Sequence, residues 1–362
     1  MLAEHNQNVL KFSYLVVSKF KPKQKLGKIL AKKGLRLTEF ISSKSVRLDQ
    51  ELASKLNIAR NQVINLIKNG NVSVNNKIIN KAGFNLNLGD KITISTPQIS
   101  EIQSEFKADF DIEIIYEDDD ILVINKPINL TIHPAPSVKE ATLVEWLKQN
   151  GYTLSNLAGQ ERAGIVHRLD KGTSGVMVVA KNNESHANLS KQLSTRDMGR
   201  IYLLLCDLAL KENCVIDRAI GRHPQNRLKN AIISNAKPSK SAFANILTSQ
   251  NKLINLVAAK LFSGRTHQIR VHLASINRHI LGDDLYGFKS NSAKIGRIFL
   301  HAYILRLIHP RSSQIMEFKA TLPSEFYELI GKEFDKEIVD ESIKADILCD
   351  IFNDISNWMY YN

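Results

Sequence analysis

The chain of 362 residues has few cysteines and lacks a long apolar run. Its three cysteines, Cys206, Cys214 and Cys349, are widely spaced and form neither a metal-ligand pattern nor a disulfide framework. A sparse, odd number of cysteines favours a reducing compartment. No apolar stretch approaches the roughly 20 residues that span a bilayer, and no signal peptide with a small-residue cleavage site is evident. We therefore expect a cytoplasmic protein with no membrane partner.

Acidic residues are scarce in the first quarter of the chain. Residues 1–100 contain 17 Lys and Arg against 5 Asp and Glu, so they carry nearly all of the net charge of +13. A basic module joined to a near-neutral body is typical of a protein that binds a polyanion, although charge alone also fits an ordinary soluble surface. The length exceeds that of one ordinary core and indicates two domains. With 43% hydrophobic and 23% charged residues, the composition is that of a globular protein.

Changes in composition divide the chain into five segments. They are a basic N-terminal extension (1–43), a compact module (44–95), a linker (96–108), a large domain (109–330) and an acidic tail (331–362). Within the extension, residues 26–37 fit either a basic helix or a flexible arm. The acid-poor composition of the extension also fits an organelle transit peptide.

The compact module is expected to form two helices followed by a small sheet. Leu48, Leu52 and Leu56 recur every four residues and mark one face of a first helix. A second helical pattern ends at the stop signal Asn69-Gly70. Alternating residues in "NVSVNNKII" predict a strand with a turn at Asn75-Asn76, and "LGDKITIS" predicts another strand.

The order of "VRLDQELA", "IARNQVINLIKNGNVSVNNKII" and "LNLGDKITIS" resembles the S4 RNA-binding domain. In that family a basic surface on the paired helices contacts the RNA backbone. The resemblance implies RNA contacts at Arg47, Arg60, Asn61 and Lys68. Ala59 stands where the family often has a serine. An alternative for Arg47 is an ion pair with the acids of its own module.

The large domain contains many strand patterns and a few helical ones. Strands are predicted at "EIIYEDDDILVINKP", "GIVHRLD", "GVMVVAK", "IYLLLCDLAL", "NLVAAKLF" and "IMEFKA", and helices at "ATLVEWLKQN", "HANLSKQLS" and "THQIRVHLASI". Because no regular βαβ repeat is present, we expect an α+β fold. It would combine a mixed, largely antiparallel β-sheet and flanking helices with a small α/β module. In the tail, amphipathic helices are predicted from Ile338, Ile343, Ile347 and Ile351.

The densest polar chemistry lies in two segments of the large domain. In "AGIVHRLDKGTSGVMVVAK", two predicted strands enclose a loop of small residues, which we expect to let a substrate approach the backbone. Arg168 could hold the Asp170 carboxylate ionised or bind a phosphate, whereas a plainer alternative has Asp170 capping its own turn. The segment "SGRTHQIRVHL" offers donors for phosphate and sugar at Arg265, His267, Gln268, Arg270 and His272. Its two histidines are five residues apart and share no helix face, so they do not indicate a metal site.

These segments resemble the RluA-type family of pseudouridine synthases. The resemblance covers most of residues 44–330 and is carried, in order, by "DDDILVINKPINLTIHP", "AGIVHRLDKGTSGVMVVAK", "GRIYLLL", "GRTHQIRVHL", "LGDDLYG" and "LHAYILRLIHP". It implies an enzyme that isomerises uridine to pseudouridine in RNA. The S4-like module and the "RHP" run resemble the RluD type, which implies large-subunit (23S) ribosomal RNA, free or in an assembling subunit, as the partner.

The resemblance also assigns roles to individual residues. Asp170 matches the catalytic aspartate, and Tyr202 matches a tyrosine that packs on the target base. Arg270, preferred to Arg265, matches the basic partner of the aspartate. The residues expected to contact RNA in this domain are Arg168, His167, Arg265 and His267. The sequence departs from the family at Asn129, where a glycine is usual, and at "GRIY", where a more basic start is common.

Pseudouridine formation breaks the bond from C1′ to N1, turns the uracil and joins C1′ to C5. Because no atom is gained or lost, we expect the reaction to need no cofactor and no metal. For the oligomeric state, we expect a monomer by default. The target nucleotide must leave its helix. Asp170 could then attack carbon or assist ribose deprotonation, and both routes stay open. Arg270 would lower the pKa of the carboxylate, while Tyr202 offers a face for uracil and a hydroxyl near C5.

Two other functions fit part of the sequence. A non-catalytic S4-type RNA-binding or ribosome-assembly factor would have the same module and the same charge. A hydrolase or nuclease could use the carboxylates at Asp118, Asp119 and Asp120, although these acids are more simply a solvated turn between two strands.

Overall fold

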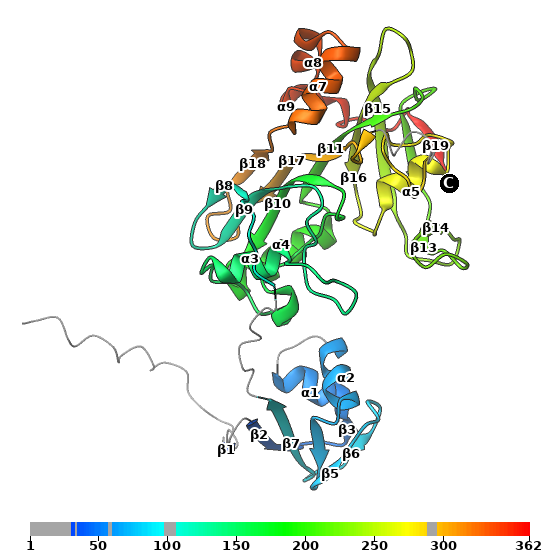
Figure 1. Cartoon of the computed structure of the whole chain (residues 1–362). Helices are drawn as coiled ribbons and strands as arrows, with labels where there is room; N and C mark the ends of the chain where they lie inside the picture. Colours follow the sequence, from blue (N-terminus) through cyan, green and yellow to red (C-terminus); the bar gives the residue numbers. More distant parts are fainter. Residues whose placement is uncertain (1–29, 33–34, 57–59, 98–105, 288–294) are drawn as a thin grey trace, which may run out of the picture. The chain divides into compact units, whose positions relative to one another are not determined.

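The computed structural model describes residues 30–32, 35–56, 60–97, 106–287 and 295–362. The chain divides into two compact units, Met1–Gln103 and Ser104–Asn362, each built around its own sheet (Figure 1). Within the described ranges, no helix has the length and apolar character needed to cross a bilayer.

The first unit packs two short helices against an antiparallel sheet. The helices are α1 (Leu48–Leu56) and α2 (Arg60–Lys68), and Leu48 and Leu52 are fully buried, as their spacing predicts. In the described part of this unit, the sheet order is β1 (Leu30–Lys32), β2 (Leu35–Ile41), β7 (Lys91–Pro97), β4 (Val72–Val74) and β5 (Lys77–Ile78). Strand β3 (Val46–Arg47), which comes before the two helices, pairs with β6 (Asn85–Leu86), which comes after them.

Both turn predictions in this unit are confirmed. Asn75 and Asn76 join β4 to β5 with φ of 50° and 67°, a left-handed pair that suits a two-residue hairpin. Gly70 follows α2 with φ of 73°, which a glycine adopts without steric cost.

The helix considered for residues 26–37 is wrong over its described part. Strand β2 pairs with β7 along its whole length, from Leu35 opposite Pro97 to Ile41 opposite Lys91. Pairing with a distant strand outweighs the weak local preference for a helix. The sheet therefore extends into the segment expected to be an extension, while residues 1–29 lie outside the described part.

The second unit is built on a mixed, largely antiparallel sheet, which confirms the predicted α+β class. Among the described residues it has ten strands, in the order β19-β12-β15-β16-β11-β17-β10-β9-β8, with β18 also paired to β17. The pairs β10–β17 and β12–β19 are parallel, and the others are antiparallel. Their bounds are β8 Glu113–Glu117, β9 Ile121–Lys126, β10 Ser174–Ala180, β11 Gly199–Cys206, β12 Cys214–Asp217, β15 Lys240–Thr248, β16 Asn255–Leu261, β17 Leu300–Ile308, β18 Ile315–Lys319 and β19 Met359–Tyr361.

Helices cover both faces of this sheet, so its central strands are buried on both sides. Along β11, Tyr202 and Leu204 face one core, and Ile201 and Leu203 face the other. Helices α3 (Leu143–Gln149), α4 (Asn183–Thr195) and α5 (Gln268–Ala274) contribute to the first core. Helices α7 (Ser324–Glu333), α8 (Lys336–Ser342) and α9 (Ala345–Ile351) pack together on the second (Figure 1). A 3-10 turn, η1 (Gln160–Arg162), and a hairpin of β13 (Ile220–Arg222) and β14 (Asn230–Ile232) complete the unit.

The acidic tail forms helices, and the predicted buried face is confirmed at Ile343, which is 2% exposed, and at Ile351, which packs against the second core, but not at the other two isoleucines. Ile338 and Ile347 are exposed (53% and 38%), while Val339 and Leu348 are buried. Because α8 and α9 are separate short helices, a single isoleucine repeat cannot follow one continuous face. The tail also ends in β19, which adds a strand to the sheet edge at β12.

Candidate active site

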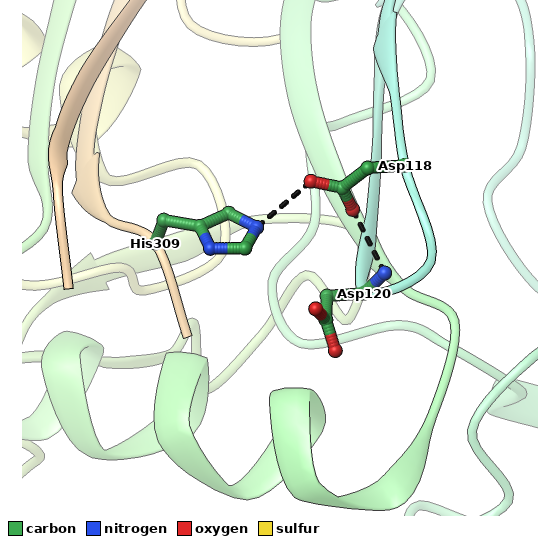
Figure 2. A group of neighbouring side chains, drawn as sticks. All are labelled: Asp118, Asp120 and His309. Carbon is green, nitrogen blue, oxygen red and sulfur yellow. Dashed lines mark hydrogen bonds and ion pairs between the residues drawn. The ribbon is translucent and has the colours of Figure 1, made fainter. Parts of the chain in front are cut away.

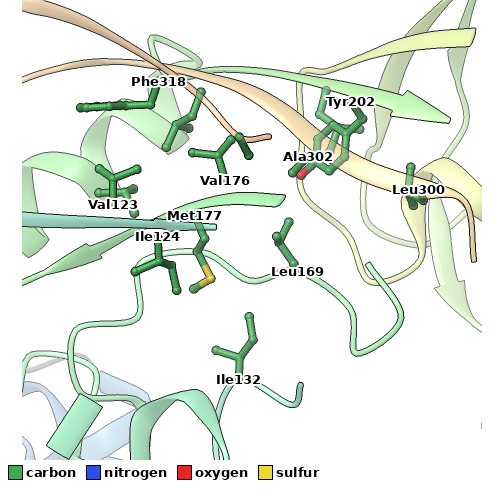
Figure 3. Packing of buried hydrophobic residues seen from close by; sticks show 14 of the residues in the cluster. Val123, Ile124, Ile132, Leu169, Val176, Met177, Tyr202, Leu300, Ala302 and Phe318 are labelled. Carbon is green, nitrogen blue, oxygen red and sulfur yellow. The ribbon is translucent and has the colours of Figure 1, made fainter. Parts of the chain in front are cut away.

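The loop that carries Asp170 is anchored through its neighbour Leu169. Leu169 is buried and belongs to the same core cluster as Met177 and Tyr202 (Figure 3). Arg168, the residue before Leu169, is exposed, and the side chain of Asp170, the residue after it, is 18% exposed. The N–H of Thr173 donates to the Asp170 carbonyl at 3.0 Å and closes a tight turn. A buried leucine between two polar residues thus fixes the direction of the carboxylate.

The strand predicted before this loop is wrong, and Gly175 has a different role from the one expected for the small residues of the loop. The segment "GIVHRLD" forms no strand beyond a single bridge between Ile165 and Val179, on the edge of β10 that β17 leaves after Gly175. Gly175, with φ of 118°, does not provide room for a substrate. A Cβ at that position would collide with the backbone of Ala302 on β17. The glycine therefore lets two parallel strands begin side by side.

Asp170, Tyr202 and Arg270 line one small pocket of about 50 Å³. Nη1 of Arg270 lies 3.9 Å from Oδ2 of Asp170, and Nε2 of His267 lies 4.0 Å from the same oxygen. The loop before β10, the strand β11 and the helix α5 supply these side chains. Residues from three distant parts of the chain therefore meet around one partly exposed carboxylate.

Asp283 is the closer partner of Arg270. Nε and Nη2 of Arg270 donate to its two carboxylate oxygens at 2.7 and 2.8 Å. The N–H groups of Leu285 and Tyr286 also donate to Asp283, each at 3.0 Å. Burial lowers the pKa of Arg270, and the hydrogen bonds and charge of Asp283 more than reverse that effect. Asp283 thus holds Arg270 charged and aimed at Asp170. Sequence reasoning gave it no role, although "LGDDLYG" contained the signal.

His267 reaches the pocket from a strained backbone position. Its φ of 60° is left-handed, which is uncommon for a residue other than glycine and frequent at functional sites. Nδ1 lies 2.9 Å from the hydroxyl of Tyr286, which accepts the N–H of Asn230 at 2.7 Å. Burial lowers the pKa of His267, opposed by the charge of Asp170. The imidazole is therefore neutral at pH 7, with Nε2 on the side of Asp170.

Tyr202 presents an aromatic surface to the pocket. It is 5% exposed, and burial raises the pKa of its hydroxyl, with the charge of Arg200 opposing and that of Asp170 adding. The hydroxyl is therefore protonated at neutral pH. A protonated phenol is a weak base, which disfavours the idea that Tyr202 removes the C5 proton.

Lys126 is a buried amine that supports the Asp170 loop. Its ammonium donates to the carbonyls of Pro127 at 2.7 Å, Leu130 at 3.1 Å and Lys171 at 3.4 Å. Burial lowers its pKa to about 7, against the opposing charge of Asp170. The lysine thus ties the end of β9 to the residue that follows Asp170.

A larger groove of about 710 Å³ adjoins the pocket. Pocket and groove share four lining residues, namely Arg168, Arg200, Gly264 and Arg265. Arg168 and Arg265 are exposed, and Nε of Arg265 donates to the Pro238 carbonyl at 3.2 Å. These two side chains lie at the boundary between the pocket and the groove.

His167 makes a contact with the protein itself. Its Nε2 accepts the backbone N–H of Val178 at 3.1 Å. Burial lowers the pKa of His167 to about 3, so the ring is neutral. This contact holds the loop against β10, and because His167 also lines the larger groove, its RNA contact stays a prediction.

In the first unit, Arg47 and Arg60 share a buried acid. Asp49 is 1% exposed, and its Oδ2 lies 3.1 Å from Nη2 of Arg47 and 2.7 Å from Nη2 of Arg60. Both arginine side chains remain about half exposed (47% and 48%), so each keeps donors on the surface. Lys68 at the end of α2 is exposed, and the side chain of Asn61 lies outside the described part. The ion pair considered for Arg47 is present and leaves its outer face open.

Asp120 is buried and Asp118 half-buried, and protein donors bind both carboxylates, which corrects the expectation of a solvated turn at these two acids. Asp118 accepts N–H groups of its own turn and lies 2.8 Å from Nε2 of His309 (Figure 2). Asp120 is 6% exposed and lies 2.6 Å from Nε of Arg311, with further donors in α4. The Arg311 hydrogen bond lowers the pKa of Asp120 to about 2. Because protein donors already occupy all four carboxylate oxygens, the cluster ties the β8–β9 turn to the segment after β17.

Comparisons with known proteins identify the family of each unit. The profile of the RNA pseudouridylate synthase family matches residues 120–275, and the S4 domain profile matches residues 46–92. An uncharacterized RNA pseudouridine synthase of Helicobacter pylori is 49% identical over 313 residues, covering 84% of this chain and 95% of that protein.

Two further relatives cover similar lengths. An uncharacterized RNA pseudouridine synthase of Bacillus subtilis is 37% identical, over 81% of this chain and 96% of that protein. Ribosomal large subunit pseudouridine synthase D of Haemophilus ducreyi is 36% identical, over 78% of this chain and 90% of that protein. The chain therefore belongs to the RluA-type family of RNA pseudouridine synthases, with an S4 domain before its catalytic unit, and is an isomerase that acts on RNA.

Proposed function

We propose that Asp170, Tyr202 and Arg270 form the catalytic centre, with Asp170 as the carboxylate that acts on the target nucleotide. The observation that carries this proposal is their convergence on one pocket, where Asp170 is accessible and lies 3.9 Å from Arg270. A uridine that has left its helix would place its base on the flat face of Tyr202 and its C1′ near the carboxylate.

The surroundings of Asp170 suit an ionised carboxylate. Arg270 supplies positive charge, and it stays in place because Asp283 holds its other edge. His267 and Lys126 add polar groups on two more sides of the loop. The carboxylate can act on carbon or on a ribose proton while the glycosidic bond breaks, and in both routes it must be unprotonated.

For the substrate, we propose large-subunit ribosomal RNA. The support is the name of the Haemophilus ducreyi relative and the S4 domain that this chain shares with RNA-binding proteins. The exposed Arg168 and Arg265 beside the pocket fit an RNA strand that continues past the extruded nucleotide. Since one chain supplies the whole pocket, we propose that the enzyme acts as a monomer, in the cytoplasm where ribosomal RNA is processed.

The catalytic assignment is tested with Asp170→Asn. This variant should form no pseudouridine in transcribed large-subunit ribosomal RNA, while its affinity for that RNA stays within a few fold of the wild type. Pseudouridine is detected by sequencing after treatment with a pseudouridine-specific reagent. Asp119→Asn, which changes an exposed acid in the β8–β9 turn, is the matched control and should keep full activity. Full activity in Asp170→Asn would remove the carboxylate from its role.

The substrate assignment needs a separate experiment. Pseudouridines are mapped in ribosomal RNA from cells that contain the protein and from cells that lack it. We expect one or more large-subunit positions to lose the modification. Unchanged large-subunit RNA with a loss in another RNA class would move the substrate to that class and leave the chemistry intact.

A further inference from the structure

Arg200 is a buried cation whose charge no described residue neutralises. It lies on β11 and is 8% exposed, and its buried Nε has no hydrogen-bond partner in the described part of the chain. No described carboxylate lies within ion-pair distance of its guanidinium, in contrast to Arg270, which has two, and Arg297, which has one. Leaving a charge buried and unpaired is costly, so such a group is unusual unless a ligand completes it.

The guanidinium lies where the catalytic pocket meets the larger groove. Arg200 lines both spaces, together with Gly264. A Cβ added to Gly264 would lie 3.0 Å from Nη1 of Arg200, so a side chain at that position would press on the end of the guanidinium. The glycine thus leaves the guanidinium uncovered on the groove side.

The charge of the groove is predominantly positive. Its basic lining residues are Arg168, Arg196, Arg200, Lys240 and Arg265, and Asp217 is its one acidic lining residue among those described. Four of these five basic side chains are exposed or half-buried, whereas Arg200 is buried. A groove of this volume and charge fits a chain of phosphates.

The strand geometry connects Arg200 to the catalytic centre. Arg200 and Tyr202 are two residues apart on β11 and therefore point to the same face, about 7 Å apart along the strand. On β17, Arg200 lies opposite Leu305 and Tyr202 opposite Ala302, with a register shift between Ile201 and Tyr202. Both side chains line the catalytic pocket, which places them on the same face of β11. An anion bound by Arg200 would lie next to a base stacked on Tyr202.

We propose that Arg200 binds a phosphate of the RNA backbone beside the target uridine, and so positions the nucleotide over Asp170. The positioning role rests on the proposed catalytic centre. Binding of the phosphate does not, and it can be measured without catalysis. A guanidinium presents two parallel N–H donors to a phosphate, and the low polarity of the site strengthens that contact. The phosphate would provide the counter-charge that no described carboxylate of the protein provides.

The test measures how binding of a short oligouridylate to the full chain depends on salt. Each phosphate contact to a single strand contributes about 0.7 to the slope of log affinity against log salt. Arg200→Met should make that slope shallower by about 0.7 and weaken binding about tenfold at low salt. Lys336→Met removes one charge from the exposed side of α8 and is the matched control, with the wild-type slope expected.

Thermal unfolding separates a binding role from a structural one. Because Arg200 is unpaired, Arg200→Met should unfold at the same temperature as the wild type or at a higher one. Arg200→Lys should keep the slope and lose affinity a few fold, since lysine retains the charge without the planar fork. In pseudouridine assays, Arg200→Met should raise KM more than it lowers kcat, because the contact forms before the chemical step.

An unchanged salt slope in Arg200→Met would overturn the phosphate site. A fall in its unfolding temperature, or failure to fold, would also overturn it by assigning Arg200 to the core. A shallower slope in Arg200→Met, together with a wild-type chain that forms no pseudouridine, would keep the phosphate site and remove only the catalytic proposal.

Discussion

Asp283 holds Arg270 through two parallel hydrogen bonds of 2.7 and 2.8 Å, on the side of the guanidinium away from Asp170. Both side chains are buried, at 2% and 7% exposure. The ion pair that approaches the catalytic carboxylate is thus supported by a second acid, which itself accepts two backbone N–H groups. Such support fixes a donor more firmly than the pocket alone would.

Asp283→Asn should lower activity through Arg270. The amide can accept one of the two hydrogen bonds but carries no charge, so the guanidinium is left partly unpaired and free to turn. A shift of about 1 Å at a reacting group can reduce rate about 100-fold. We expect a loss of that order in kcat, and a loss of roughly 3 kcal/mol in the free energy of unfolding. Urea unfolding and single-turnover assays measure the two effects. Asp284→Asn, the neighbouring acid in the same turn, should change neither.

Two substitutions of Tyr202 should distinguish the contribution of its ring to activity from that of its hydroxyl. Stacking of a base on an aromatic ring contributes about 1–3 kcal/mol, so Tyr202→Leu should lose roughly 5- to 150-fold in kcat/KM. Tyr202→Phe should lose clearly less, because the ring face remains and the hydroxyl, whose pKa burial raises, stays protonated. Equal losses in the two variants would show that the hydroxyl, and not the face, is what the reaction needs.

The fold should lose stability in mild acid because of buried histidines. Burial lowers the pKa of His272 to about 4 and that of His301 to about 3, and both side chains are fully buried. An unfolded chain protonates these rings below about pH 6.5, whereas the folded chain resists protonation until about pH 4. The free energy of unfolding should therefore fall with decreasing pH across this window.

The two rings together should contribute about 3 kcal/mol per pH unit in the middle of that window. Urea unfolding at pH 7, 6 and 5 measures the slope. His272→Gln should reduce the slope by about 1.4 kcal/mol per pH unit. A slope that His272→Gln leaves unchanged would mean that the folded chain already protonates this ring.

Removal of the first unit should weaken RNA binding and its salt dependence. The structure sets the cut after Gln103, because β7 runs to Pro97 and a cut at residue 95 would divide it. Without Arg47, Arg60 and Lys68, the salt slope should become shallower by about 0.9 for each duplex phosphate that these side chains bind. Filter binding over a range of salt concentrations gives the slopes of the full and the shortened chain. If the shortened chain keeps the full slope, the first unit is not the RNA anchor.

Local patterns were enough to predict much of the fold. Regular spacing identified α1, the turn at Asn75-Asn76 and most strands of the second unit, because burial on one face imposes a period that the sequence must follow. The same patterns failed at "LRLTEFI" and "GIVHRLD". At both places the outcome depended on contacts with distant parts of the chain, which no local pattern records.

The sequence by itself determined the chemistry that is available: an aspartate in a tight loop, a tyrosine on a strand, and a run of donors opening a helix. The three-dimensional arrangement decided how those groups are used. It paired Arg270 with Asp283, turned His167 toward the backbone and left Arg200 without a counter-charge at the edge of a groove. The physical reason is that burial and pairing depend on which distant segments meet, and a charge has a different role when its partner is an acid, an amide or an incoming phosphate.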